Sequence, residues 1–154
     1  MRTGLTTVLL LVVLAGCAPS PETLVREALR EAELAAEQER VSDLRGLVAE
    51  QYQDDDGRTR DDLIRLAKDY VERHRPVHFL IVERRLVRTG SGPIEVELLV
   101  AAASVPLESL LDVSRASADV GVVTLSFLEE SQHTWRIARA DWRPASAADF
   151  LPRR

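Results

Sequence analysis

The chain contains 154 residues, of which 20 are basic and 25 are acidic, so its formal net charge is −5. An acidic chain without a block of basic residues matches the phosphate backbone poorly, which argues against a nucleic-acid partner. Apolar residues make up 45% of the chain, enough for one domain with one packed core. The single cysteine excludes an internal disulfide.

The N-terminal segment has the pattern of a secretory signal peptide. Arg2 precedes an apolar run, Val8–Ala15, that is far shorter than the roughly 20 residues a membrane-spanning helix needs. Small residues then stand before Cys17, as signal-peptide cleavage requires. We therefore predict a cleaved signal peptide over residues 1–16 and a short tether over residues 17–20.

Leu14-Ala15-Gly16-Cys17 resembles the lipobox of bacterial lipoproteins, in which diacylglycerol is attached to the cysteine thiol. The resemblance implies cleavage between Gly16 and Cys17 and a lipid-bilayer partner, held through fatty acyl chains such as palmitate on Cys17. Two or more acyl chains hold a protein stably at a membrane. In a cell with two membranes, Asp after the cysteine of such lipoproteins commonly signals retention at the inner membrane, so Ala18 favours the outer membrane of the cell envelope. The alternative is an ordinary secretory signal that leaves Cys17 as an unpaired thiol.

Two helices are predicted before the middle of the chain. Ser20 followed by Pro21 is a typical N-cap and first helical position, and apolar residues then recur at helical spacing to about Glu39. Ser42 caps a second, short helix that ends before Glu50.

The acidic stretch Asp54–Gly57 is typical of a turn, and a third helix is predicted to follow it. Thr59 and Asp62 have the spacing of an approximate capping box at the start of this helix. The helix is predicted to end near His74, because Pro76 cannot continue it.

The pattern then changes to the alternation of β-branched and aromatic residues that is typical of strands. Four strands are predicted, over Val77–Val87, Ile94–Ser104, Asp119–Leu128 and Thr134–Trp142. The first two and the last two are joined by short polar connections of hairpin length, which predicts a mainly antiparallel sheet. Residues 106–118 fit either a turn of helix or a covering loop. The tail, residues 144–154, is either frayed or docked through Phe150 and Leu151.

Helices followed by an antiparallel sheet predict an α+β fold, with the helices packed on one face of a curved sheet of four or more strands. Over residues 21–143 this order resembles the nuclear transport factor 2-like superfamily of cystatin-like α+β cones, which includes polyketide-cyclase-like proteins. The residues that carry the resemblance are the turn Tyr52–Gly57, the helix opening at Thr59, and the last strand with Trp135-Arg136-Ile137 and Ala140-Asp141-Trp142. The resemblance implies a cone-shaped cavity that is either a ligand pocket, an active site or filled with side chains.

The candidate catalytic residues are Asp54, His78 and Asp141. Acid–base chemistry in such a cavity needs a carboxylate or histidine beside a hydrogen-bond donor, where water is excluded. Alternatively, Asp141 pairs with opposite charges across the sheet. The alternative for His78 is a surface histidine, or a core histidine whose ring nitrogens are hydrogen-bonded. The candidate pocket residues are Tyr52, Tyr70, Trp135 and Trp142.

No metal or other cofactor is expected. When Gly57 is placed at the sixth position of a helix–loop–helix calcium site, Tyr52 falls at the first position and Leu63 at the twelfth, so the required carboxylates are missing. The histidines do not have the spacing of a metal site, because Pro76 separates the only close pair. The histidines are His74, His78 and His133.

The favoured hypothesis is therefore a membrane-tethered, non-enzymatic domain that binds an envelope protein or a small apolar ligand. The alternative is a cone-fold isomerase, dehydratase or cyclase that acts on a small apolar substrate. No one enzyme's catalytic set can be matched residue by residue onto this chain, so the resemblance implies architecture rather than activity. A third possibility is a structural subunit that forms a homodimer through the open face of the sheet.

Overall fold

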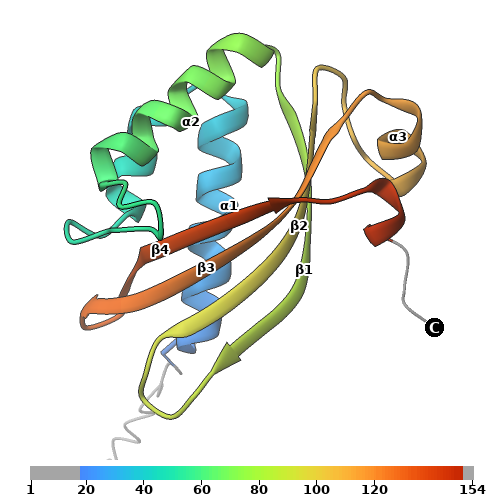
Figure 1. The fold of residues 1–154 in the computed structure, drawn as a ribbon. Coiled ribbons are helices and arrows are strands. Elements are labelled where there is room, and N and C mark those ends of the chain that lie inside the picture. The colour runs from blue at the N-terminus through green and yellow to red at the C-terminus, as the bar shows by residue number, and fades with distance from the viewer. Residues whose placement is uncertain (1–17, 151–154) are drawn as a thin grey trace, which may run out of the picture.

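A computed structural model describes residues 18–150 of the chain (Figure 1). The predicted signal peptide, which ends at Gly16, the predicted lipidation residue Cys17, and Leu151 lie outside the described residues. The elements in chain order are α1 (Pro21–Glu37), η1 (Val41–Leu47), α2 (Arg60–His74), β1 (His78–Arg88), β2 (Ile94–Ala103), α3 (Leu110–Arg115), β3 (Asp119–Ser131), β4 (Thr134–Pro144) and η2 (Ala147–Phe150).

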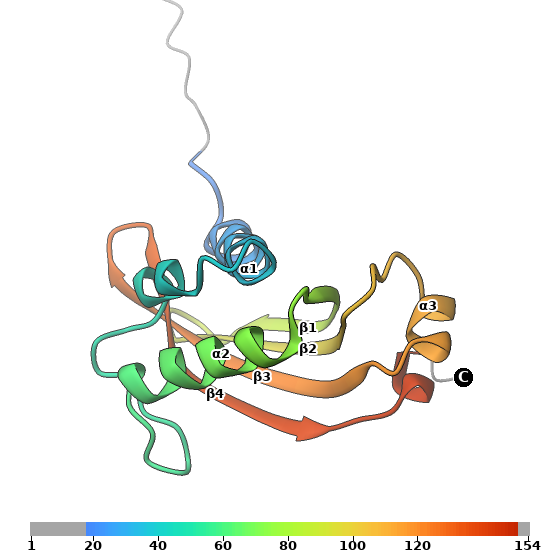
Figure 2. The same ribbon diagram turned by 90° about the horizontal axis from the view of Figure 1, so that it is seen from above.

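The strands form one four-stranded antiparallel sheet in the order β1-β2-β3-β4. The pairing shifts by one residue in β1, between Glu83 and Arg85, and again between β3 and β4 beside Phe127. Such bulges bend a strand and increase its twist. Figure 2 shows the curved sheet with α1 on its inner side. The predicted α+β class, with helices packed on a curved antiparallel sheet, is confirmed.

Three segments refine the sequence predictions. The second predicted helix is a 3₁₀-helix that begins at Val41 rather than at Ser42, and it ends where Val48 bridges to Ile137 of β4. The segment between β2 and β3 contains the short helix α3. The tail docks on the sheet, because Phe150 of η2 is buried.

The largest apolar core lies between α1 and the inner face of the sheet. Ser20 caps α1 by accepting a hydrogen bond from the Thr23 backbone N–H at 3.2 Å, and Val25 of the same helix is 0% exposed. Val25 packs against residues of β2, β3 and β4 that alternate along each strand, as one face of a sheet requires. These strand residues are Ile94, Val96, Leu98, Leu125, Phe127 and Trp135.

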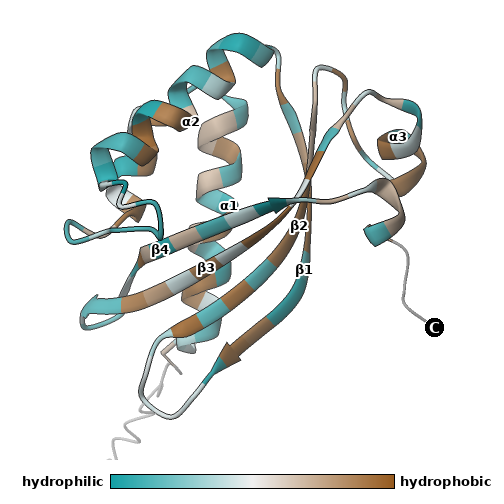
Figure 3. Ribbon diagram, in the orientation of Figure 1, coloured by the Kyte–Doolittle hydropathy of each residue, from teal (hydrophilic) through white to brown (hydrophobic). Residues whose placement is uncertain are grey.

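Two smaller cores complete the packing. Val71 of α2 packs with Val41 of η1, which joins these helices to each other and to the start of the sheet. On the outer face of the sheet, Leu99 and Val122 are covered by Val113 of α3 and Phe150 of η2. One end of the sheet is therefore buried on both faces. Figure 3 shows how hydrophobic and hydrophilic residues alternate along the strands.

All described elements and their cores lie within residues 18–150, so a fragment of residues 18–154 contains the whole described fold. Within this described range, none of the helices combines the length and the apolar character needed to cross a membrane.

The capping box of α2 provides a test of the helix boundary. The Thr59 backbone N–H donates to Asp62 Oδ2 at 2.9 Å, and the Thr59 side chain accepts from the Asp62 backbone N–H. We expect Thr59→Ala to lower the free energy of unfolding by about 1 kcal/mol, because an N-terminal N–H of α2 loses its acceptor. Urea denaturation of the 18–154 fragment measures this change. Thr59→Ser keeps the acceptor and should remain near the parent; an equal loss in both variants would contradict the capping role.

Candidate functional site

The candidate site is a cleft of about 610 Å³ between α2, the loop that precedes it, and the inner side of β3 and β4. Its walls combine an apolar floor, two tyrosines and a rim of carboxylates. The residues that line it are Tyr52, Asp54, Asp55, Asp56, Arg58, Leu63, Leu66, Ala67, Tyr70, Val123, Ala140, Asp141 and Trp142.

The loop before α2 is held in place by hydrogen bonds to the edge strand β4. The Ala49 N–H donates to the Ile137 carbonyl at 2.9 Å, and the Gln53 N–H donates to the Ala138 carbonyl at 3.3 Å. This pairing places Tyr52 in the cleft wall, where its side chain is only 3% exposed. The Tyr52 hydroxyl is buried and lies next to the backbone N–H of Ala140, which acts to lower its pKa. Burial raises the pKa of Tyr52, and the nearby Asp54 carboxylate raises it further.

The acidic turn after Tyr52 is closed by the side chain of Asp54. Its carboxylate accepts hydrogen bonds from the backbone N–H groups of Asp56 at 3.0 Å and Arg58 at 2.8 Å, and from Arg58 Nη1 at 3.0 Å. Gly57 has φ +75°, a conformation that glycine adopts without strain. Burial alone would raise the pKa of Asp54, but the bonds from Arg58 and Asp56 outweigh it and lower that pKa overall. Asp54 is therefore an ionised group fixed within the turn.

The other carboxylates of the rim differ in their partners. Asp56 pairs with Arg58 at 2.6 Å, and Asp55 pairs with Arg139. Asp141 takes part in no ion pair with any residue between 18 and 150; its Oδ1 accepts the backbone N–H of Trp142 at 2.9 Å. The predicted pairing of Asp141 with an opposite charge across the sheet is wrong, because the register of β3 and β4 places Thr124 opposite it.

The floor and one lip of the cleft are apolar. Val123 of β3 and Ala140 of β4 form the floor, and Leu66 of α2 faces them from the helix. Trp142, at the outer edge of β4, is 65% exposed. A Cβ atom added at Gly121 would lie 3.6 Å from Cε3 of Trp142, so the indole ring rests against a position without a side chain.

Tyr70 lies between this cleft and a smaller hollow at the C-terminal end of α2. Its hydroxyl donates to Asp119 Oδ2 at 2.9 Å, and its ring stacks on His74 with 4.2 Å between the ring centroids. Nε2 of His74 is 3.8 Å from the same Asp119 oxygen. Burial, reinforced by the hydrogen bond and the charge of Asp119, raises the pKa of Tyr70 to about 12.

Most of the residues selected from the sequence lie in this cleft, but two do not. Tyr52, Asp54, Tyr70, Asp141 and Trp142 all line it. The other two are His78, which pairs with Ala103 on the outer face of the sheet, and Trp135, which belongs to the core under α1. The guanidinium carbon of Arg88 is 5.1 Å from the centroid of the Trp135 ring.

Sequence reasoning missed the α2 residues of the wall and the cation that closes the acidic turn. Leu63, Leu66 and Ala67 recur at helical spacing, so the apolar stripe of α2 was their signal. Arg58 stands four residues after Asp54, which was a signal for a local ion pair. Within the described part of the chain, no group of three or more His, Cys, Asp or Glu side chains is placed to hold a metal ion.

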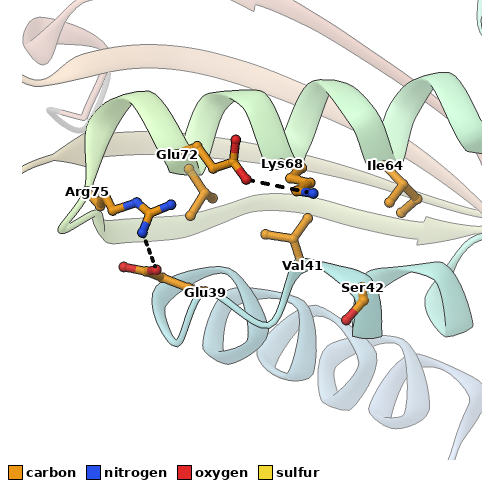
Figure 4. A pocket seen from close by; sticks show the side chains of 8 residues that line it. Glu39, Val41, Ser42, Ile64, Lys68, Glu72 and Arg75 are labelled. Carbon is orange, nitrogen blue, oxygen red and sulfur yellow. Dashed lines mark ion pairs between the residues drawn. The ribbon is translucent and has the colours of Figure 1, made fainter.

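A second hollow, between η1 and α2, is smaller and its charges are paired (Figure 4). Its volume is about 280 Å³, and Val41, Ile64 and Val71 form its apolar part. At its edge Glu39 pairs with Arg75 at 3.2 Å, and Lys68 lies 3.8 Å from Glu72. Because these charges pair with one another, we interpret this hollow as a packing gap between η1 and α2. The cleft beside β4 is the stronger candidate site.

Among known proteins, the chain is similar to solved structures only. No family model and no curated protein matches the chain. A predicted scytalone dehydratase from Novosphingobium aromaticivorans has a TM-score of 0.63 at 12% identity, with 84% of this chain and 87% of that chain covered. Rd1NTF2_04 with long sheet has a TM-score of 0.53 at 11% identity, with 75% and 95% covered. The domain has a nuclear transport factor 2-like fold.

Bd1075 from Bdellovibrio bacteriovorus is also similar, with a TM-score of 0.61 at 16% identity over 79% of this chain. This chain spans only 40% of the length of Bd1075. Likeness at these identities concerns the nuclear transport factor 2-like fold and does not extend to activity.

The hydrogen bond from Tyr70 to Asp119 provides a test of the geometry at the end of α2. The chain has two tyrosines, and we expect Tyr70→Phe to remove a phenolate absorbance step near pH 12. Because folding raises the pKa of Tyr70 from 10.0 to about 12, its contribution to stability is complete below pH 10 and is lost as the pH rises through 12. Denaturation across this range should show a steeper decline in the parent than in Tyr70→Phe. A Tyr70 step near pH 10 in the folded protein would contradict the contact.

Proposed function

We propose that the chain is a lipid-anchored protein of the bacterial cell envelope whose domain binds a small apolar ligand without transforming it. The observation that supports binding most directly is the composition of the cleft. An apolar floor lies beneath an exposed Trp142, while the Asp54 carboxylate, whose side chain is 7% exposed, is committed to fixed hydrogen bonds.

The exposed apolar surface of the cleft supports an apolar ligand. Trp142 and Leu66 are among the large hydrophobic side chains that remain exposed, and they lie on opposite sides of the same cleft. Removing apolar surface from water contributes roughly 25 cal/mol per Å². A ligand that fills the space between β4 and α2 covers both residues and gains this contribution.

The ionisable groups of the cleft support binding rather than catalysis. An efficient acid–base catalyst needs a group whose pKa lies near the working pH. Asp54 has a lowered pKa, whereas Tyr52 and Tyr70 have raised ones, so each keeps one protonation state at neutral pH. None of the residues that line the cleft is a histidine.

The anchor is supported by the lipobox-like sequence and by the start of the fold. Only Ala18, Pro19 and Ser20 separate Cys17 from the first residue of α1. Extended residues span about 3.3–3.6 Å each, so this tether reaches about 10 Å. Acylation of Cys17 would hold the start of α1 next to the bilayer, and Ala18 favours the outer membrane.

Replacement of the anchoring residue tests the location. Cys17→Ala should lose fatty-acid incorporation and move from the membrane to the soluble fraction of a bacterial host, because at least two acyl chains are needed for a stable anchor. Labelling with radioactive palmitate, followed by fractionation, measures both effects. Ser20→Ala, which alters the tether but not the lipobox, serves as the matched control. Unchanged labelling of Cys17→Ala would refute the anchor.

Binding of 1-octanol to the 18–154 fragment tests the cleft. We expect saturable amide shifts in the NMR spectrum that centre on Leu66, Val123 and Ala140. Trp142→Ala should weaken the affinity about tenfold, or about 1.4 kcal/mol, because the ligand no longer covers the apolar surface of the indole ring, which contributes roughly 25 cal/mol per Å². Leu111→Ala, which removes a 63% exposed side chain from α3, is the matched control.

An equal effect of the two variants, or shifts scattered over the surface, would count against the cleft as the binding site. Conversion of a small molecule by the fragment, lost in Asp54→Asn while the fold is intact, would instead establish the enzymatic alternative.

A further inference from the structure

The proposed anchor joins the domain at one end of the sheet. The three residues between Cys17 and α1 reach about 10 Å when extended. Val25, in the second turn of α1, packs in the same core cluster as Ile94, the first residue of β2. Figure 1 shows the start of α1 and the β1–β2 hairpin at the same end of the molecule, with α3 at the other end of the sheet. The hairpin therefore lies close to the point where an acylated Cys17 would meet a bilayer.

The tip of this hairpin, residues 89–93, is a closed turn without an acidic residue. Its sequence is Thr89-Gly90-Ser91-Gly92-Pro93. The Gly92 N–H donates to the Thr89 carbonyl at 3.1 Å, and Ser91 is exposed. Arg88, which precedes the tip, takes part in no ion pair with any residue between 18 and 150. Hydroxyl and guanidinium groups donate hydrogen bonds to phosphate oxygens, so this tip suits the headgroups of phospholipids.

The side of α1 would present a more acidic surface to a bilayer. The helix contains five glutamates and two arginines, a net charge of −3, and Arg26 is already paired with Glu83 at 2.8 Å. Among these glutamates, Glu22 is the one in the first turn. Because phosphate groups repel carboxylates, contact along the whole helix is less favourable than contact at its start.

We propose that the domain contacts a phospholipid bilayer through the tip of the β1–β2 hairpin, beside the start of α1. The partner is a lipid surface, whose phosphate groups lie next to Arg88 and the hydroxyls of Thr89 and Ser91. This inference rests on the proposed anchor at Cys17 and adds the face of the domain that the anchor turns toward the membrane. In this orientation α3 points away from the bilayer.

Coupling of the chain to lipid discs tests the orientation without cellular acylation. Residues 17–154 contain a single cysteine, so a maleimide lipid joins Cys17 to discs of phosphatidylcholine and anionic phosphatidylglycerol. A lipid with a nitroxide on its headgroup then broadens the NMR signals of amides that lie near the surface. We expect the amides of residues 89–92 to lose the most intensity and those of α3 to lose the least.

Two serine variants separate contact with lipid from tethering alone. Ser91→Glu places a negative charge at the tip and should lower the broadening of the hairpin amides at least about twofold, because anionic lipid repels it. Ser117→Glu adds the same charge at an exposed position between α3 and β3, at the other end of the sheet, and should leave the broadening unchanged. Equal effects of the two variants would mean that net charge decides and would overturn the inference.

The pattern of broadening also identifies the competing orientations. If the exposed side of α1 is broadened most, the domain lies along that helix, and the inference is overturned. Broadening of α3 as strong as that of the hairpin would overturn it as well. Because the maleimide lipid replaces acylation, hairpin contact on discs together with unchanged palmitate labelling of Cys17→Ala would refute the anchor alone.

Discussion

The docking of residues 48–53 on the outer edge of β4 is the contact on which the cleft depends. An edge strand presents unpaired N–H and C=O groups, and here the Ala49 and Gln53 N–H groups satisfy two carbonyls of that edge. The bridge between Val48 and Ile137 ends η1, and the same docking places Tyr52 in the wall. Because the acidic turn follows directly, the contact also sets where α2 begins.

The same docking stops short of the second half of β4, and the cleft opens there. The loop turns away after Gln53, where it bonds to Ala138, and the remaining wall is supplied by α2. Beyond Ala138, the inward-facing residues of β4 are Ala140 and Trp142, so a small residue forms the floor and a large one forms the lip. The exposed indole is therefore a consequence of where the covering loop ends.

Much of the fold follows from local sequence signals, whereas the face on which a strand residue lies does not. The caps Ser20 and Thr59 and the change from helical to alternating apolar spacing are local, and the structure contains both caps. His78 lies on the outer face because its register pairs it with Ala103, and register is set by strand pairing over a long separation in sequence.

The bulge in β4 shows the same limit for the two tryptophans. Seven positions separate Trp135 from Trp142, so a regular strand would direct them to opposite faces. The shift in register beside Phe127 places both on the inner face, with Trp135 in the core under α1 and Trp142 at the cleft. Alternation alone cannot reveal this, because the extra residue is visible only once β3 is paired with β4.

The pKa shifts of Tyr52 and Asp54 support the proposed binding role of the cleft. In acid–base enzymes, neighbouring groups are tuned so that one gives and the other takes a proton near the working pH. Here burial raises the pKa of Tyr52, while the bonds from Arg58 and Asp56 lower that of Asp54 despite its burial. The pKa values of Tyr52 and Asp54 are therefore shifted in opposite directions, and both shifts lead away from neutral pH. A phenol that stays protonated beside a carboxylate that stays ionised provides a fixed arrangement of polar groups next to the apolar floor.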